Sequence, residues 1–353
     1  MKTKIVYVVA SLDDDIYMEQ AIVSAWSARH FNPDCRIEMV CDQDTFATLN
    51  SGIRAQYKNL FDQIHIREFL PEQGMKERSR WLKTTLREIV EGDFLYLDTD
   101  TVVCADLSYV DDFDFDLGMV LDCNCQFSKT LVFDWVVPTM KQMYKIDVSR
   151  ETLYFNSGVA FVRDCQLTRE FYKRWNELWV HSMQHFGKLK DQQPLMKANI
   201  DMGYVITELS GDLNCQVAES IQYLHTAHVM HFFNSLLGVS YEMSPFYKDL
   251  YLCVKLKGIT TDEENTIILC KSSFTSPSMP VPYEGAMLWR KHLKKSAATK
   301  VIEATIEASN SYRLLFCLWN RIPMFMHISD KCIGTSIQAF CAIKNLFFHH
   351  PSR

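Results

Sequence analysis

Two aspartates separated by a single residue are the clearest chemical feature of this sequence. Asp98 and Asp100 follow the apolar run Phe94-Leu95-Tyr96-Leu97, and β-branched residues come directly after them. The apolar run predicts a buried central strand, and side chains alternate along a strand, so both carboxylates should point the same way. Paired carboxylates are typical ligands of hard divalent cations, and such a cation can hold a diphosphate. The alternative is that both residues only form the turn after the strand.

The segments before this pair alternate between strand and helix patterns. Apolar runs predict strands at 5–10, 36–41 and 64–69, and helical periodicity predicts helices at 18–30, 45–57 and 76–91. Strands alternating with helices indicate βαβ units and a mostly parallel sheet. Ligands of such sheets bind beyond the carboxyl ends of the strands. We therefore expect Ser11, Asp42 and the Asp98–Asp100 pair, which follow three of the strands, to lie along one rim.

The middle of the chain adds further strands and one more helix. The strands are expected at 116–121, 155–162 and 227–233, and the helix at 167–183. Gly158 lies inside the second of these strands, where a glycine often marks a close approach of backbone or ligand. His228 and His231 lie three residues apart on the last strand, so they should point to opposite faces. His225 is a weaker candidate for a functional histidine.

Composition excludes several classes of protein. The chain has 353 residues, 48% of them hydrophobic, and no apolar run of about 18 residues that would span a membrane. Its 12 cysteines include no CxxC pair, which favours reduced thiols over a disulfide scaffold or a zinc site. The N-terminus is interpreted as the first strand rather than a signal peptide, because its apolar part is short and aspartates follow at 13–15. We expect a cytoplasmic protein with no nucleic-acid partner.

Several short motifs occur in an order that is found in one known family of enzymes. They are Arg80-Trp81-Leu82, then Phe94-Leu95-Tyr96-Leu97-Asp98-Thr99-Asp100, Tyr154-Phe155-Asn156-Ser157-Gly158-Val159, Asp191-Gln192, Leu213-Asn214 and Met230-His231-Phe232. Over about residues 1–240 the chain thereby resembles the family-8 glycosyltransferases, the retaining group that contains glycogenin and lipopolysaccharide galactosyltransferases. The resemblance implies an α/β protein with the GT-A fold, whose Rossmann-like mixed sheet binds a nucleoside diphosphate sugar, and here a helical C-terminal extension would follow it.

The resemblance also implies a reaction, a cofactor and a set of site residues. The enzyme would move a hexose from a nucleotide sugar, UDP-glucose or UDP-galactose, to a glycan or a lipid-linked saccharide, with retention. It would use Mn²⁺, or Mg²⁺, held by Asp98, Asp100 and His231, and the imidazole favours manganese. The donor would meet Ser11, Asp42, Arg80, Lys83, Asp98, Asp122 and Asn156. Asp191 and Gln192 would meet the reacting sugar, with Gln192 closest to a catalytic role.

Each of these residues also has a structural interpretation. Asp42 and Ser11 suit turns, Arg80 and Lys83 suit a solvated helix face, and His231 suits a protein core. Asp191 could cap a helix that leaves Gln192 exposed. Two departures from the family stand out as well. The segment Phe233-Asn234-Ser235-Leu236-Leu237 lacks the lysine that normally meets the diphosphate, and Gln193 replaces a usual acid.

Other function classes remain open at this stage. Asp98-Thr99-Asp100-Thr101 also matches the nucleophile loop of haloacid-dehalogenase-like phosphatases, but that loop normally ends the first strand of its domain. A sugar nucleotidyltransferase of related fold would carry a glycine-rich loop after the first strand, and residues 11–15 contain no glycine. A non-catalytic nucleotide-sugar-binding protein is the remaining alternative.

The distribution of charge divides the chain. Residues 285–353 contain ten Lys and Arg but only three Asp and Glu. The remaining residues contain 27 Lys and Arg and 40 Asp and Glu. We expect a catalytic domain at 1–255, a linker at 256–285, and a basic, apolar, helical segment at 286–353. This last segment is expected to dock on the anionic inner face of a membrane, where lipid-linked acceptors would lie. The alternative is that its helices pack on the catalytic domain.

Overall fold

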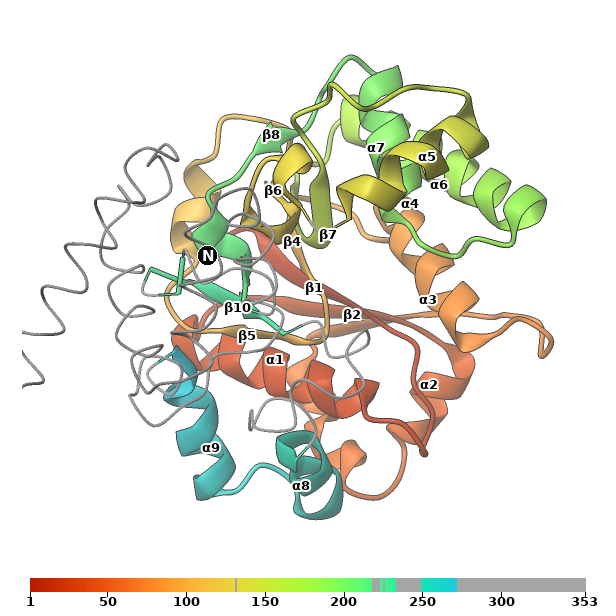
Figure 1. The fold of residues 1–353 in the computed structure, drawn as a ribbon. Coiled ribbons are helices and arrows are strands. Elements are labelled where there is room, and N and C mark those ends of the chain that lie inside the picture. Colours follow the sequence, from red (N-terminus) through yellow and green to blue (C-terminus); the bar gives the residue numbers. More distant parts are fainter. Residues whose placement is uncertain (131, 218–222, 225, 233–248, 272–353) are drawn as a thin grey trace, which may run out of the picture.

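The computed structural model describes residues 1–130, 132–217, 223–224, 226–232 and 249–271, which form an α/β fold (Figure 1). Its main sheet has the strand order β3-β2-β1-β4-β7-β6-β8. The strands are β1 (Lys4–Val9), β2 (Ile37–Asp42), β3 (Gln63–Arg67), β4 (Phe94–Leu97), β6 (Leu117–Leu121), β7 (Phe155–Val162) and β8 (Thr207–Glu208). A smaller sheet contains β5 (Thr101–Val103), β10 (Val229–His231) and β9 (Cys215–Gln216), in that order.

The main sheet is mixed. β1 pairs in parallel with β2 and β4, and β2 pairs in parallel with β3. β7 runs antiparallel to both β4 and β6. The predicted α/β class with a Rossmann-like mixed sheet is therefore confirmed. Because β2, β1 and β4 are parallel neighbours, their carboxyl ends meet at one edge of the sheet, as the rim prediction requires.

Helices cover both faces of the main sheet. They are α1 (Tyr17–Phe31), α2 (Gln43–Thr48), α3 (Met75–Thr84), α4 (Leu86–Ile89), α5 (Phe133–Tyr144), α6 (Gln166–Phe186), α7 (Gln192–Asp201), α8 (Asp249–Lys257) and α9 (Thr261–Ile268). Ile5, Tyr7 and Val9 of β1 pack with α1 on one face, and Val6 and Val8 pack with α3, α4 and α6 on the other. Both faces of β1 are buried, which explains its unbroken apolar run.

Two predicted helices are each divided in the structure. The expected helix at 45–57 is wrong, because α2 ends at Thr48 and a separate 3₁₀ helix runs over Arg54–Leu60. Gly52 between them has φ +65°, a conformation that ends a helix. The expected helix at 76–91 is divided between α3 and α4 at Thr85, whose φ of −104° and ψ of 7° lie outside the helical region. No predicted element corresponds to α5, which contains a proline, Pro138.

The Asp98–Asp100 segment connects the two sheets. β4 ends at Leu97, and the chain turns through Thr99 into β5, so the two aspartates lie in a turn rather than on a strand. The turn is held by three hydrogen bonds: Asp98 N–H donates to Gly158 O at 2.7 Å, Phe232 N–H donates to Asp100 O at 3.0 Å, and the Thr101 hydroxyl donates to Asp98 O at 2.8 Å. The site is therefore attached to both β7 and β10.

The last described helices lie against α1 (Figure 1). α8 and α9 both contact α1, and α9 begins with a capping box in which Thr260 and Glu263 bond each other's backbone and side chain. The range 256–285, expected as a linker, thus begins with a packed helix. The segment 286–353 lies outside the described residues. None of the helices in the described part is long and apolar enough to cross a membrane.

Candidate active site

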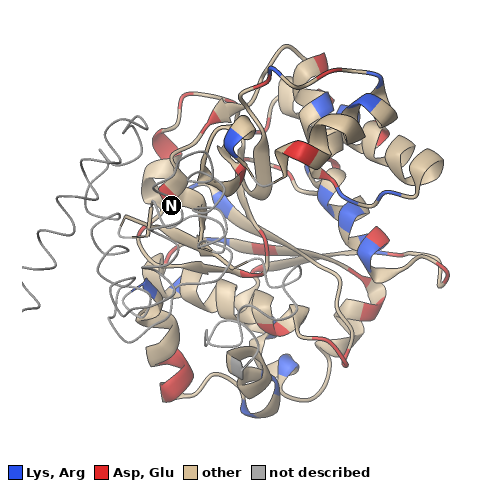
Figure 2. Cartoon of the chain, viewed as in Figure 1, with Lys and Arg blue, Asp and Glu red and all other residues tan. Residues whose placement is uncertain are grey.

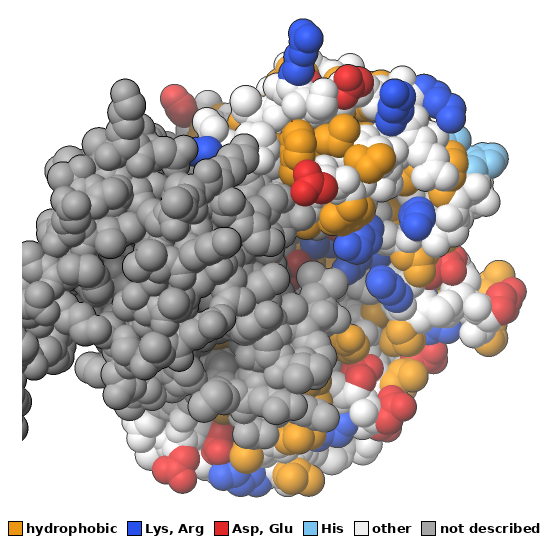
Figure 3. Space-filling model, in the orientation of Figure 1, with side chains coloured by type: hydrophobic (Ala, Val, Ile, Leu, Met, Phe, Trp, Pro, Cys, Tyr) orange, Lys and Arg blue, Asp and Glu red, His pale blue; other side chains and the backbone are white. Residues whose placement is uncertain are grey.

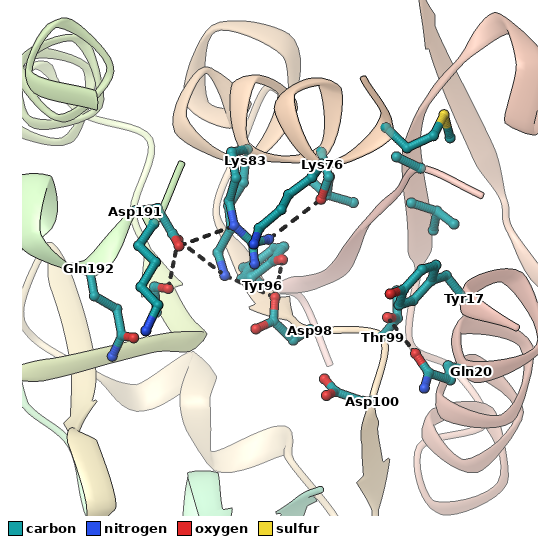
Figure 4. A pocket seen from close by; sticks show the side chains of 18 of the residues that line it. Tyr17, Gln20, Lys76, Lys83, Tyr96, Asp98, Thr99, Asp100, Asp191 and Gln192 are labelled. Carbon is teal, nitrogen blue, oxygen red and sulfur yellow. Dashed lines mark hydrogen bonds and ion pairs between the residues drawn. The ribbon is translucent and has the colours of Figure 1, made fainter. Parts of the chain in front are cut away.

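A polar pocket of about 370 Å³ opens at the carboxyl ends of β1 and β4. Its walls come from α1, from α3, from the turn after β4 and from the start of α7 (Figure 4). Eight residues that the sequence analysis singled out line it, namely Arg80, Lys83, Asp98, Asp100, Asn156, Asp191, Gln192 and His231. Elements that are distant in the sequence thus bring most of the predicted residues together.

Three potential metal ligands meet at one side of this pocket. Ligand atoms of Asp98, Asp100 and His231 all lie within 4.8 Å of one another. His231 Nε2 is 3.2 Å from Asp100 Oδ1 and 4.0 Å from Asp98 Oδ2. Two carboxylates and one imidazole suit a borderline cation such as Mn²⁺. The donor set therefore fits the divalent cation that the sequence resemblance implies.

A chain of hydrogen bonds orients the His231 ring. The Gly158 N–H can only donate, so Asn156 Oδ1, 2.9 Å away, must be the oxygen. Asn214 Nδ2 donates to this same oxygen at 3.0 Å, which turns Asn214 Oδ1 toward His231 Nδ1 at 3.0 Å. Nδ1 therefore donates to Asn214, and Nε2 faces the two carboxylates. Metal-binding histidines are commonly fixed in this way.

Lys83 and Tyr96 fix the other end of the metal site. Lys83 Nζ lies 2.9 Å from Asp98 Oδ1, and the Tyr96 hydroxyl donates to the same oxygen. The second oxygen of Asp98 is the one that faces His231. Burial and the charge of Asp98 raise the pKa of Tyr96 well above its usual value, so the phenol stays a donor. Tyr96 precedes Asp98 by two residues, and side chains two residues apart along a strand share a face. This spacing is the sequence signal that points to Tyr96.

Asp191 is a buried carboxylate held by two cations. Arg80 Nε lies 3.2 Å from Asp191 Oδ1, Lys83 Nζ lies 3.6 Å from Oδ2, and the Ser157 hydroxyl donates to Oδ2 at 2.8 Å. Burial alone would raise the pKa of Asp191, but Arg80 and Lys83 lower it below its usual value. Asp191 occupies the N-cap position of α7, yet its side chain makes no cap hydrogen bond. The helix-cap interpretation of this side chain is therefore wrong.

Gln192 is oriented by a second buried acid, Asp122. Gln192 Nε2 donates to Asp122 Oδ1 at 2.9 Å and to Phe155 O at 3.3 Å. Both donors of the amide are directed into the protein, so its oxygen is left to meet a ligand in the pocket. Burial raises the pKa of Asp122, and hydrogen bonds from Asn156 and Gln192 oppose this shift.

Three residues that were predicted to contact the nucleotide sugar do not line this pocket in the part of the chain that the structure describes. Asp122 lies behind Gln192, as above. Asp42 is fully buried, caps α2 by accepting from Thr45 N–H at 2.8 Å, and pairs with Arg78 at 3.0 Å. Ser11 is fully buried, and its hydroxyl accepts from Met18 N–H at 3.1 Å at the start of α1. All three make contacts within the protein that support the rim.

The pocket also contains residues that the sequence analysis did not identify. Among them are Tyr17 and Gln20 from α1, Lys76 from α3, and Lys190 immediately before Asp191. Of the other histidines, His228 lies outside the pocket, and its Nδ1 is 2.7 Å from Asp106 O. This contact gives His228 a structural role. His225 lies outside the described residues.

Comparisons with known proteins find glycosyltransferases among the similar solved structures. No family model and no curated protein matches the sequence. Solved structures similar to this chain include mouse xyloside xylosyltransferase 1 in its apo form, with 13% identity, 66% of this chain and 98% of that chain covered, and a TM-score of 0.46. Another is the galactosyltransferase LgtC in complex with donor and acceptor sugar analogues, with 17% identity, 74% of this chain and 98% of that chain covered, and a TM-score of 0.46.

A third similar structure is the glycosyltransferase GlyE of Streptococcus pneumoniae TIGR4. It has 14% identity, 80% of this chain and 66% of that chain covered, and a TM-score of 0.43. These three are glycosyltransferases, the class that the sequence resembles. At such low identity, these structures do not establish the activity of this chain.

Proposed function

We propose that this protein is a metal-dependent glycosyltransferase of the GT-A type. It would transfer a hexose from a nucleotide sugar, UDP-glucose or UDP-galactose, to a glycan or a lipid-linked saccharide, with retention. One observation carries the proposal: ligand atoms of Asp98, Asp100 and His231 converge at the same pocket as Asp191 and Gln192. A cation site beside buried polar groups is what transfer from a nucleoside diphosphate sugar needs.

The cation and the protein would divide the work of the reaction. A divalent cation at Asp98, Asp100 and His231 would supply a Lewis acid that neutralises charge on the departing nucleoside diphosphate. Asp191, held ionised by Arg80 and Lys83, would accept hydrogen bonds from sugar hydroxyls. The amide oxygen of Gln192 would stabilise positive charge at a reacting sugar carbon.

The order of the strands disfavours the phosphatase alternative. The nucleophile loop of those enzymes ends the first strand of its domain, whereas β1, β2 and β3 all precede β4 here. Asp98 also already accepts hydrogen bonds from Lys83 and Tyr96, which suits a positioned ligand better than an attacking carboxylate. An activity assay distinguishes a transferase from a protein that only binds nucleotide sugars.

Calorimetry with UDP tests the proposal directly. UDP should bind the wild-type protein in the presence of Mn²⁺ and at least about tenfold more weakly without it. Asp98→Asn and Asp100→Asn should each remove this dependence, because each takes away a charged ligand. Asp114→Asn, which changes an exposed carboxylate outside the pocket, is the matched control and should bind as the wild type does.

A turnover assay completes the test. Slow hydrolysis of UDP-glucose or UDP-galactose with Mn²⁺ would identify a transferase, because water can replace the acceptor. Metal-dependent UDP binding without any hydrolysis or transfer would instead identify a nucleotide-sugar-binding protein. Metal-independent UDP binding in all variants would contradict the metal site itself.

A further inference from the structure

The pocket carries more positive charge than its carboxylates neutralise. Its lining includes four cationic side chains, Lys76, Arg80, Lys83 and Lys190, but three anionic ones, Asp98, Asp100 and Asp191. A divalent cation would add two positive charges, and the diphosphate of a nucleotide sugar would bring two negative ones. An excess of one positive charge would therefore remain after metal and donor are bound, which leaves room for a further anionic group.

The excess comes from two of the four cations. Arg80 and Lys83 are paired with Asp191 and Asp98. Within the described ranges, neither Lys76 nor Lys190 forms an ion pair with a carboxylate, and both side chains are exposed at the pocket mouth. Both lysines line the same pocket, and desolvation there together with the nearby charge of Lys76 lowers the pKa of Lys190. Lys and Arg side chains gather along α3 on this face (Figures 2 and 3).

An aromatic surface lies next to this pair of lysines. Lys190 Nζ sits 4.4 Å from the ring centroid of Trp135, which projects from α5 and is 36% exposed. Exposed aromatic rings beside polar groups are suited to the apolar faces of sugar rings. Lys190 is also two residues from Gln192, so a ligand at Trp135 and Lys190 would lie beside the reacting sugar. Lys76 faces the same pocket from α3 (Figure 4).

We propose that Lys76, Lys190 and Trp135 form an acceptor subsite for a saccharide that carries an anionic group, either a carboxylate or a phosphate. The tryptophan ring would contact the face of the sugar, and the two ammonium groups would bind the anion. This inference rests on the proposed function, because only a transferase has an acceptor. The binding of the saccharide itself does not require turnover. Because the lysines are exposed, the interaction should weaken as salt rises.

Ligand binding measured by NMR saturation transfer and calorimetry tests the subsite. The probes are methyl β-glucuronide, glucose 6-phosphate and the neutral methyl β-glucoside, each with and without UDP and Mn²⁺. At least one anionic probe should bind about tenfold more tightly than the glucoside. A preference for glucuronide alone would identify a carboxylate, and a preference for glucose 6-phosphate alone would identify a phosphate.

Variants separate the roles of the three residues. The double change Lys76→Ala and Lys190→Ala should remove the anionic preference, whereas Lys190→Arg should keep it. Trp135→Ala should weaken the binding of all three saccharides alike, because it removes the contact with the sugar ring and leaves the charged groups in place. Lys173→Ala, an exposed lysine on α6 outside the pocket, is the control and should change nothing.

Two outcomes would overturn the inference without touching the proposed function. One is equal binding of anionic and neutral saccharides by a wild-type protein that binds UDP and Mn²⁺. The other is a double lysine variant that loses UDP binding while it keeps the anionic preference, because the lysines would then serve the donor. Failure of the proposed function has its own signature, which is loss of metal-dependent UDP binding in the wild type whatever the saccharides do.

Discussion

At the scale of single residues, the site depends on side chains whose orientation is set by neighbours. His231 is 2% exposed, and the Asn156–Asn214 chain turns its Nε2 toward the carboxylates. Asp98 is turned by Lys83 and Tyr96 so that one oxygen faces His231. A cation that binds here would therefore meet ligands that have little rotational freedom left to lose.

His231 should be needed for metal-dependent binding, and His228 should not. His231→Ala removes the nitrogen atom of the proposed metal site and should lower the affinity for Mn²⁺ at least about tenfold. His228→Ala removes a ring that contacts Tyr109 and Asp106 outside the pocket, so Mn²⁺ affinity should stay as in the wild type. Titration of Mn²⁺ by calorimetry measures both. Equal and mild losses in the two variants would favour a core role for His231.

At the scale of elements, β7 brings the two sheets close enough to share a site. Gly158 of β7 lies directly under His231: a Cβ added there would be 2.2 Å from His231 Cε1 and 2.8 Å from Nδ1. The close approach expected at this glycine is thus made by the imidazole of His231, which packs against the Gly158 backbone. The same strand contributes Asn156 and Ser157 to the pocket.

Gly158→Ala should displace His231 and weaken metal binding. The clash should lower stability and also lower the affinity for Mn²⁺ by about 10- to 100-fold. Gly118→Ala on the neighbouring strand β6 is the control, because its Cβ would meet Phe115 at 2.6 Å and Leu209 at 2.7 Å, away from His231. Thermal unfolding should show losses for both variants, and a Mn²⁺ titration should show a loss for Gly158→Ala alone. Matching Mn²⁺ affinities in the two variants would contradict this.

A buried ion pair network ties β1, β2 and β3 together, and it makes stability depend on pH. Glu38 of β2 is 1% exposed and lies 2.8 Å from both Lys4 Nζ and His65 Nε2. Burial would raise the pKa of Glu38, but hydrogen bonds from His65 and Lys4 lower it from 4.5 to about 2. Because the folded pKa is depressed, this stabilisation is complete above the unfolded value and is lost as pH falls toward the folded one.

Glu38→Gln should destabilise the protein at neutral pH and matter less in acid. The free energy of unfolding at pH 7 should fall by about 2–3 kcal/mol relative to the wild type. The difference should stay constant above about pH 5 and shrink between about pH 4.5 and 2. Urea unfolding at several pH values measures it, with the exposed Glu72→Gln as the control. A difference that does not change with pH would mean that packing and not charge is responsible.

At the scale of the whole molecule, an acidic body is joined to a basic C-terminal segment. Residues 286–353 lie outside the described residues, so the expected membrane contact stays a prediction. Basic residues near an anionic bilayer contribute about 1 kcal/mol each, and Arg313, Arg321, Lys331 and Lys344 interrupt stretches of sequence rich in Leu, Phe, Trp and Met. Such a contact would place the enzyme beside lipid-linked acceptors on the inner membrane face.

Sedimentation with liposomes tests the membrane prediction. The full chain should bind vesicles that contain anionic lipid, and binding should weaken as ionic strength rises. Truncation after Tyr283 should abolish binding while metal-dependent UDP binding persists. Neutral vesicles are the control. A full-length protein that ignores anionic vesicles at low salt would favour packing of the segment on the catalytic domain.

The sequence by itself determined the features that depend on local patterns. Buried strands are visible as apolar runs because both faces of the sheet are covered, and the parallel pairing of the first strands followed from their alternation with helices. Asp98 and Asp100 were predicted from their spacing after an apolar run, and His231 from its place in the order of motifs. Local patterns also located Gly158, since a glycine weakens a strand interior and commonly occurs where another group needs the space of a side chain.

Only the tertiary structure decided how these residues act on one another. The pairing of Lys83 with Asp98, and of Arg80 with Asp191, depends on how α3 packs against β4 and α7, and no spacing in the sequence encodes that distance. The structure likewise shows Ser11 and Asp42 supporting the rim from within, and Lys76 and Lys190 at the pocket mouth. A polar residue at a strand or helix end can face either the protein or the pocket, and the packing of distant segments makes that choice.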